Sequence, residues 1–265
     1  MTVETPVTAS FQSARRLSPG NDPAGAMYEI RFRMLSGHQP ARPGQFYMVR
    51  PAIGSAPLLP RPLAPFLDTR DEIAFGIRVI GDGTRRMIAA MKGEPWTVLG
   101  PYGNGFDAPV TPREKIWLVG GGIGVPPLVH LASQYPSDYT AIIGAKTGGE
   151  LHWTRQFGGA GVFLSTDDGS EGFRGTAADL LRHLLSRATK PDRIITCGPH
   201  PLMAATAAIC RAANIRCDVS LEERMACGTG ICISCVCRIR TPDGNYRHAR
   251  VCAEGPVFPA EEVHW

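Results

Sequence analysis

Three cysteines near the C-terminal end of the chain have the spacing of metal ligands. Cys227, Cys232 and Cys235 follow the pattern C-x₄-C-x₂-C in the stretch ACGTGICISCVC, and sixteen residues separate the last of them from Cys252. Plant-type [2Fe–2S] clusters are held by cysteine thiolates with this spacing. Structural zinc more often uses two separate C-x₂-C pairs, whereas this chain has one. The spacing therefore favours a [2Fe–2S] cluster over zinc, with zinc as the open alternative.

The other cysteines fit neither a second cluster nor a disulfide framework. The chain has eight cysteines, and its N-terminal residues contain no continuous apolar segment of a secretory signal. We therefore expect a cytoplasmic protein in which thiols stay reduced, so a disulfide knot is disfavoured. Cys237, Cys210 and Cys217 lie outside the ligand pattern, and we interpret them as structural.

A glycine-rich turn in the middle of the chain has the composition of a phosphate-binding loop. The stretch LVGGGIGVPPL (118–128) is an apolar strand followed by glycines, including Gly122 and Gly124, and then by a helical pattern. Such a turn lets the backbone approach a pyrophosphate, and the helix that follows offers it free N–H groups. The alternative is a tight strand–helix turn that binds no ligand.

Two further turns follow later apolar strands of the same region. Asp168 lies in STDDGSEGFRG (165–175), and Cys197 lies in TCGPHPLM (196–203). Ligands of open parallel sheets bind at the carboxyl ends of the strands. The three turns together predict one dinucleotide site, although Cys197 taken alone would be interpreted as a small buried residue.

The N-terminal part contributes one arginine and one glycine turn that suit a second phosphate group. Arg61 stands between apolar residues and prolines in LLPRPLAP, and Gly83 and Thr84 belong to IGDGTRRM. An arginine offers a planar fork of donors to a phosphate, and a helix that starts at Thr84 would offer N–H groups. Each feature alone is more often an ordinary surface arginine or helix cap.

Three regions would position these residues. Residues 1–109 carry short strand patterns punctuated by Pro and Gly, with one helical pattern over 84–93, which predicts an antiparallel β-barrel. In residues 110–219 apolar strands alternate with helical patterns, for example over 176–187 and 201–213, which predicts a parallel α/β nucleotide-binding domain. Residues 220–265 form a small cysteine-rich [2Fe–2S] domain that includes a hairpin turn at 242–244. The expected fold class is therefore a multidomain β plus α/β protein.

Composition excludes several other classes of function. The formal net charge is +4 without a long Lys/Arg run, which gives little support to nucleic-acid or membrane-surface binding. No apolar run reaches the roughly 20 residues of a membrane-spanning helix. The seven histidines are scattered and form no nucleophile–base arrangement, so hydrolytic chemistry is unsupported.

The whole chain resembles a known flavoprotein family. The stretch SLEERMACGTGICISCVC, followed by VCAEGPVF, closely resembles the electron-transfer subunits of bacterial dihydroorotate dehydrogenase B, which are relatives of ferredoxin–NADP reductase-like flavoproteins. Seven further stretches match that family in order: PGQFYMVR, RPLAP, GDGTRRM, GPYGNGF, VGGGIGVPPL, TDDGSEGFRG and CGPHPLM. The cysteine stretch is the most specific of these motifs.

The resemblance implies sites for three cofactors: FAD, NAD and [2Fe–2S]. It assigns the FAD diphosphate to Arg61 with Gly83 and Thr84, and the flavin side of the same motif to Pro62, Leu63 and Ala64. The position of Ala64 usually carries Ser or Thr near the reactive edge of the flavin, so the hydroxyl is missing here. The NADH site would be lined by Gly122, Gly124, Asp168 and Cys197, and the cluster would be held by Cys227, Cys232, Cys235 and Cys252.

The resemblance also implies a function. The chain would exchange electrons between NAD(H), FAD, the cluster and an FMN-containing dihydroorotate dehydrogenase catalytic subunit, in a complex with two copies of each chain. Dihydroorotate would be oxidised to orotate, and NAD⁺ would be reduced. Two alternatives stay open: a reductase subunit for another acceptor, such as a hydrogenase, a sulfur-reducing complex or an oxygenase, and a non-enzymatic module with structural zinc.

Overall fold

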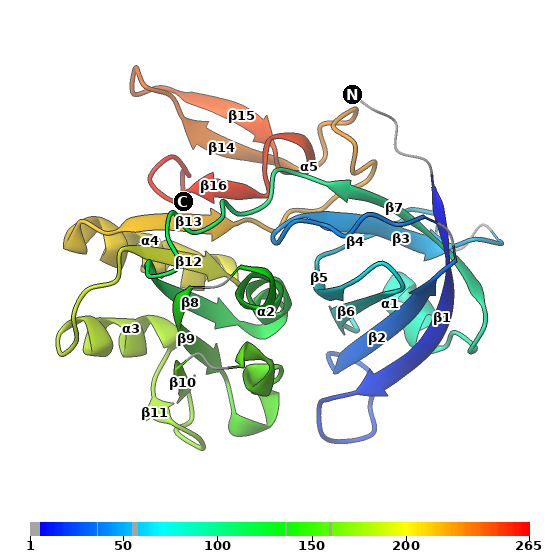
Figure 1. The fold of residues 1–265 in the computed structure, drawn as a ribbon, viewed down its shortest axis with the longest axis horizontal. Helices are drawn as coiled ribbons and strands as arrows, with labels where there is room; N and C mark the ends of the chain where they lie inside the picture. Colours follow the sequence, from blue (N-terminus) through cyan, green and yellow to red (C-terminus); the bar gives the residue numbers. More distant parts are fainter. Residues whose placement is uncertain (1–5, 36, 55–57, 136, 159–160) are drawn as a thin grey trace.

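A computed structural model describes residues 6–35, 37–54, 58–135, 137–158 and 161–265. Within these residues the strands form two seven-stranded sheets and one two-stranded sheet. Figure 1 shows the first large sheet beside the second, with the two-stranded hairpin above them. The N-terminal sheet is called the barrel domain below, and the second large sheet with its helices is called the nucleotide domain. In the described part of the chain no helix is long and apolar enough to cross a membrane.

The barrel domain is an antiparallel sheet that curls toward closure. Its strands lie in the order β4-β3-β7-β1-β2-β6-β5. Their bounds are β1 (Val7–Arg16), β2 (Met27–Met34), β3 (Phe46–Pro51), β4 (Arg61–Leu63), β5 (Pro65–Asp68), β6 (Glu72–Arg78) and β7 (Pro95–Tyr102). Buried side chains such as Phe32, Tyr47, Phe75 and Trp96 fill the interior of the curl. Aromatic rings in edge-on and tilted contact thus form the core that fixes strands β3 and β4.

One short helix, α1 (Asp82–Ile88), follows β6. The sequence predicts this helix over 84–93 with Thr84 at its start, and both bounds are wrong. Thr84 is the third helical residue, and its hydroxyl bonds back to the N–H of Gly81 at 3.2 Å. The start therefore lies upstream of Thr84, because the capping side chain reaches back along the chain rather than forward.

The nucleotide domain is a parallel sheet covered by helices on both faces. Its strand order is β11-β10-β9-β8-β12-β13-β16. The strands are β8 (Lys115–Gly121), β9 (Asp138–Ala145), β10 (Gly161–Thr166), β11 (Phe173–Arg174), β12 (Arg193–Cys197), β13 (Arg216–Ser220) and β16 (Val257–Pro259). The helices are α2 (Val125–Gln134), α3 (Ala177–Leu185) and α4 (His200–Ala213), with 3₁₀ turns η1 (Gly122–Gly124), η2 (Gly148–Glu150) and η3 (Thr154–Phe157).

The helices divide between two hydrophobic cores. Helices α3 and α4 pack together on one face, and α2 packs on the other face, toward β5 of the barrel domain. Thr176 caps α3 by accepting a bond from the Asp179 N–H at 3.2 Å, as a start at 176 predicts. A β-barrel followed by a parallel α/β sheet confirms the fold class expected for these two regions.

The C-terminal segment is divided between a hairpin and the nucleotide domain. Strands β14 (Val236–Arg240) and β15 (Tyr246–Arg250) form the hairpin around the predicted 242–244 turn, and α5 (Val251–Glu254) follows. Strand β16 then returns and pairs antiparallel with β13 at the edge of the nucleotide sheet. The chain is thus anchored in the nucleotide domain on both sides of its cysteine segment.

Candidate functional site

The four predicted ligand cysteines lie on two segments, brought together at the base of the hairpin. Cys227, Cys232 and Cys235 belong to the loop of residues 226–235, called the cluster loop below, which joins β13 to β14, and Cys252 lies in α5. The Sγ atoms of Cys227 and Cys232 are 3.2 Å apart. Cys235 and Cys252 form a second pair of contacting thiols, and both are buried.

This pairwise arrangement suits two metal ions better than one. Each iron of a [2Fe–2S] cluster takes two cysteine thiolates, whereas structural zinc takes four ligands at a single point. The donor set therefore fits a binuclear cluster held by Cys227 with Cys232 and by Cys235 with Cys252.

Backbone N–H groups point at the sulfurs of both pairs. The N–H groups of Cys232 and Thr229 donate to Cys227 Sγ at 3.4 and 3.5 Å, and the Cys252 N–H donates to Cys235 Sγ at 3.5 Å. Burial works to raise the pKa of Cys227, but the hydrogen bonds from Cys232 and Thr229 outweigh it and bring the pKa to about 6. Burial, followed by contact with Cys235, raises the pKa of Cys252 to about 12. Donors of this kind offset the negative charge of a thiolate-bound cluster.

Two glycines hold the cluster loop against its surroundings. Gly228 and Gly230 have φ angles of +71° and +81°, which glycine adopts at no steric cost. A Cβ atom on Gly228 would lie 2.5 Å from Met48 Cγ on β3, and one on Gly230 would lie 2.9 Å from Ala253 Cβ. The cluster loop is therefore packed directly on the wall of the barrel domain.

The remaining cysteines lie apart from this arrangement. Cys237 points to the Ala249 carbonyl oxygen at 3.7 Å across the hairpin, and burial raises its pKa to about 11. Cys210 and Cys217 are buried in mutual contact between α4 and β13, and that contact, together with burial, raises the pKa of Cys217. These surroundings agree with structural roles.

The predicted flavin motif forms a close contact between two distant segments. Arg61, Pro62 and Leu63 make up strand β4, and Gly83 lies inside α1. A Cβ atom on Gly83 would lie 2.1 Å from Arg61 Nε, so the guanidinium occupies the space that any larger residue would fill. Arg61 also donates to the Leu59 carbonyl oxygen at 2.8 Å. The fold thus holds the guanidinium at the start of α1, where a phosphate group can accept its remaining N–H donors.

The other members of the motif have different positions. The Thr84 hydroxyl accepts from the N–H groups of Ile80 and Gly81 and donates to the Gly81 carbonyl oxygen, which uses its full hydrogen-bonding capacity within its own turn. Ala64 lies between β4 and β5 and packs against the core that includes Met48 and Cys235.

The nucleotide turns meet at the carboxyl edge of the parallel sheet. Strands β8 and β12 are neighbours, with Cys197 opposite Gly120. A Cβ atom on Gly124 would lie 2.3 Å from the Cys197 carbonyl oxygen, so the two turns are in backbone contact. Gly122 has a positive φ of 56° and lies near Met27 of the barrel domain. Burial raises the pKa of the Cys197 thiol to about 12.

Asp168 lies at the same edge but outside this contact. It follows β10, two strands away from β8, and its carboxylate accepts from the Ser170 hydroxyl and N–H at 2.6 and 2.9 Å. These bonds lower the pKa of the exposed Asp168 carboxyl. The structure therefore brings Gly122, Gly124 and Cys197 together and leaves Asp168 in a turn of its own.

Asn104 is a positioning residue that the sequence reasoning missed. It belongs to GPYGNGF, which the pattern alone presents as a connector. Its side chain donates to the Val257 carbonyl oxygen at 2.7 Å and accepts from the Val257 N–H at 3.1 Å. It also donates to the Glu254 carbonyl oxygen at 3.3 Å, and its own N–H donates to the Gly255 carbonyl oxygen at 2.7 Å. Asn104 thus ties the end of the barrel domain to the chain that follows Cys252.

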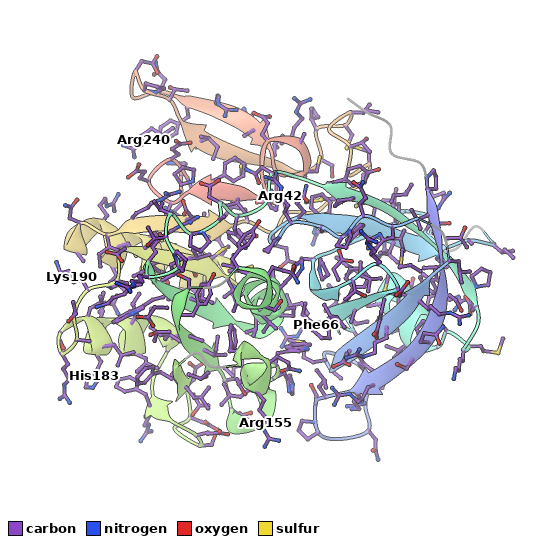
Figure 2. All side chains as sticks on the ribbon, viewed as in Figure 1. Arg42, Phe66, Arg155, His183, Lys190 and Arg240 are labelled. Atoms are coloured by element: carbon purple, nitrogen blue, oxygen red, sulfur yellow. The ribbon has the colours of Figure 1, made fainter. Side chains whose placement is uncertain are left out.

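Trp153 is a second residue that was missed. It has a positive φ of 59°, is buried, and lies 6.4 Å from Phe66, ring centre to ring centre. A Cβ atom on Gly76 would lie 2.7 Å from both Trp153 and Pro126, so the indole fills a hollow on strand β6. Figure 2 shows Phe66 between the two large sheets, where these residues join the barrel domain to the nucleotide domain.

Comparison with known proteins gives consistent results. Residues 222–264 match the family described as the iron-sulfur cluster binding domain of dihydroorotate dehydrogenase B. The chain is 34% identical over 242 residues to the electron transfer subunit of dihydroorotate dehydrogenase B (NAD(+)) from Caldanaerobacter subterraneus subsp. tengcongensis, covering 91% of this chain and 93% of the relative. It is 39% identical over 248 residues to the protein of the same name from a Geobacillus species, covering 89% and 92%.

A solved structure with the same fold supports the architecture. It is the subject of a study entitled "Insights into flavin-based electron bifurcation via the NADH-dependent reduced ferredoxin-NADP oxidoreductase structure". The TM-score is 0.78 at 25% identity, covering 96% of this chain and 91% of that one. The expected relation to ferredoxin–NADP reductase-like proteins is confirmed.

Proposed function

The chain belongs to the family of electron-transfer subunits of NAD⁺-dependent dihydroorotate dehydrogenase B, and from this premise we propose how its residues perform that function. The protein is an oxidoreductase subunit that exchanges electrons between NAD(H), FAD, a [2Fe–2S] cluster and a catalytic partner in pyrimidine biosynthesis. Overall, dihydroorotate and NAD⁺ give orotate, NADH and a proton, and dihydroorotate oxidation requires the partner.

The protein supplies binding and orientation, while the cofactors supply the redox chemistry. When bound, FAD exchanges a hydride with NAD(H) and single electrons with the cluster, which links two-electron to one-electron chemistry. Arg61 neutralises the FAD diphosphate, and Gly83 leaves the room for its guanidinium. Thr84 shapes the turn rather than contacting the phosphate, because its hydroxyl is already saturated.

The observation that carries the proposal is the position of the cluster loop on the barrel wall. Cys227 pairs with Cys232, and Cys235 pairs with Cys252. Gly228 places this loop against Met48, in the strand that pairs with β4 of the flavin motif. A cluster on these cysteines would therefore lie against β3, the neighbour of the strand that carries the flavin motif, which suits the short separation that electron transfer requires.

The nucleotide site is supported by the contact between the turns that contain Gly124 and Cys197. Both turns lie at the carboxyl edge of the sheet, where ligands of open parallel sheets bind, so we assign the pyrophosphate and nicotinamide to this edge. Cys197 stays protonated at neutral pH, since its pKa is about 12, so it lines the site as a neutral thiol. Asp168 is an ionised acceptor that suits the ribose hydroxyls of NAD(H).

The relatives are named as subunits, and the chain accordingly has a catalytic partner subunit. We infer that this partner carries FMN and that the complex contains two copies of each chain. Ile231 and Ile233 flank the ligand Cys232 with exposed fractions of 81% and 78%. Two isoleucines exposed beside a cluster ligand favour contact with the partner at the cluster loop.

An anaerobic absorption titration tests the proposal. The purified chain, reconstituted with FAD, iron and sulfide, is titrated with NADH and then mixed with an FMN-containing dihydroorotate dehydrogenase catalytic subunit. We expect flavin and cluster bands that bleach with NADH, and dihydroorotate-dependent NAD⁺ reduction only in the mixture. Bleaching without coupled activity would direct the search to another acceptor, and a colourless zinc protein would refute the cluster assignment altogether.

A further inference from the structure

The hairpin beside the cluster has one face on which three arginines gather. Strand β14 pairs with β15 so that Val236 is opposite Arg250, Arg238 opposite His248, and Arg240 opposite Tyr246. Side chains two residues apart point to the same side of a strand, so these six residues share one face, called the basic face below. All six are solvent-exposed, and none of them is acidic. Glu262 lies beside Arg240, because the Arg240 N–H bonds to the Glu262 carbonyl oxygen next to the Ile239–Val263 bridge, but its carboxylate forms no ion pair with Arg240 among the described residues.

Two arginines of the basic face lack a charge partner within the chain. Among the residues that the structure describes, neither Arg238 nor Arg240 forms an ion pair, whereas Arg247 and Arg250 both pair with Glu254. Figure 2 shows Arg240 near the turn end of the hairpin. Arg238 is diagonal to Arg250 across the two strands, and like charges so placed do not favour the strand pairing.

Stacking on Tyr246 holds these arginines in place. The guanidinium carbons of Arg238 and Arg240 lie 4.9 and 5.8 Å from the centre of the Tyr246 ring. The ring itself packs against His264 at 4.5 Å, which anchors it on the C-terminal segment. Cation–π stacking restrains an arginine while its N–H groups stay available to carboxylates. The basic face is therefore organised before any partner binds.

The basic face begins where the cluster ligands are. Cys235 directly precedes Val236, and the Val251 N–H bonds to the Cys235 carbonyl oxygen at 2.9 Å. Arg250 at the end of β15 donates to the Gly230 carbonyl oxygen in the cluster loop at 2.7 Å. Arg238 is three residues from a ligand, or about 10 Å along an extended strand. A protein docked on this face would cover the cluster as well.

We propose that the basic face docks an acidic surface of the catalytic partner, with Arg238 and Arg240 as its carboxylate-binding residues. This inference rests on the proposed function and adds the chemistry of recognition to it. Charge complementarity indicates the chemistry of the partner: carboxylates are the protein side chains that pair most strongly with two exposed guanidinium groups. Steering by such charges raises the association rate most strongly at low salt.

The test compares charge-matched double variants of the full reconstituted chain. Arg238→Glu with Arg240→Glu reverses two charges on the basic face. Arg187→Glu with Lys190→Glu makes the same change on an exposed flank of the nucleotide domain, where Figure 2 shows Lys190. The dissociation constant for the catalytic subunit is measured at low and high salt. NADH oxidation with ferricyanide reports on flavin integrity, and the absorption bands of the cluster report on cluster integrity. Tyr246→Leu and Tyr246→Phe test the stacking.

We expect the basic-face double variant to weaken binding by about tenfold or more at low salt, with a much smaller loss at high salt. The control pair should bind as wild type, Tyr246→Leu should lose affinity, and Tyr246→Phe should retain it. If the basic-face variant binds the catalytic subunit as tightly as wild type, and the wild-type chain couples to that subunit, the docking proposal is overturned while the proposed function stands. If the wild-type chain fails to couple to the catalytic subunit, the proposed function fails and this inference fails with it. If the wild-type chain binds nucleic acid tightly and the basic-face variant does not, the basic face is a nucleic-acid site and the docking proposal is wrong.

Discussion

Replacing Asn104 by alanine removes the side chain that joins the barrel domain to the segment after Cys252. Two partly buried hydrogen bonds to Val257 are lost, at 2.7 and 3.1 Å, together with an exposed one to Glu254. Each partly buried bond contributes about 1 kcal/mol net, and an unpaired Val257 N–H adds about 1 kcal/mol more. The expected loss in free energy of unfolding is therefore about 2–3 kcal/mol.

Chemical denaturation followed by flavin fluorescence and by cluster absorbance measures this loss. Because the bonds hold the chain immediately beyond Cys252, we expect the cluster bands to disappear at lower denaturant than the flavin signal changes. Asn104→Asp serves as the closest variant, since it keeps the acceptor for the Val257 N–H but cannot donate to the Val257 carbonyl oxygen. Asn21→Ala, at an exposed residue, controls for the loss of an asparagine as such.

Asn104→Asp should be at least as unstable as Asn104→Ala, because its carboxylate faces two carbonyl oxygens. The reasoning is refuted if Asn104→Ala stays within 0.5 kcal/mol of wild type, about the size of an ordinary surface substitution. It is also refuted if flavin is lost before the cluster, since that order would place the weakened contact inside the barrel domain.

Further substitutions test the other contacts. Gly83→Ala should displace the Arg61 guanidinium and weaken FAD binding by at least about tenfold, measured by fluorescence titration. An unchanged affinity for FAD would show that Arg61 does not bind the diphosphate. Cys235→Ser should abolish the absorption bands of the cluster and the coupling to dihydroorotate, while NADH–ferricyanide activity through the flavin persists. Cys237→Ser is the matched control and should keep the cluster bands and the coupling. Gly76→Ala should displace the Trp153 indole and lower the free energy of unfolding by about 1–3 kcal/mol, measured by chemical denaturation. Hydride transfer from NADH to the flavin should also become slower, measured by stopped flow. A faster transfer would contradict the role of this contact in joining the two domains.

The sequence predicts which candidate residues lie together wherever local spacing determines it. The C-x₄-C-x₂-C pattern lies on one loop, so the proximity of Cys227 and Cys232 follows from a few bonds of chain. Gly124 and Cys197 were also predictable as neighbours, since both follow strands of one parallel sheet. Asp168 follows such a strand too, yet the strand order leaves it two positions from β8, which periodicity does not reveal.

Contacts between domains were out of reach of the sequence patterns. Asn104 stands between two glycines in a loop, and nothing in GNG distinguishes a residue that bonds to Val257, about 150 positions later, from a turn residue. Trp153 looks like an ordinary apolar residue until Gly76 provides its hollow. Strand β16 has three residues, too few to show alternation, and its role depends on the open edge of β13.

These inter-domain contacts explain how one small segment can serve both electron transfer and docking. The cluster loop is fixed at three places: Gly228 packs on the barrel wall, Asn104 holds the chain after Cys252, and β16 pairs with β13. All three lie at the base of the hairpin, and the basic face lies beyond them. A partner that binds Arg238 and Arg240 therefore contacts strand β14, whose base these three contacts hold against the barrel and nucleotide domains. The distance from flavin to cluster should accordingly be the same with and without the catalytic subunit. Pulsed EPR on the reduced chain, alone and in the complex, measures that distance, and a change of several ångströms on binding would show that the base of the hairpin moves.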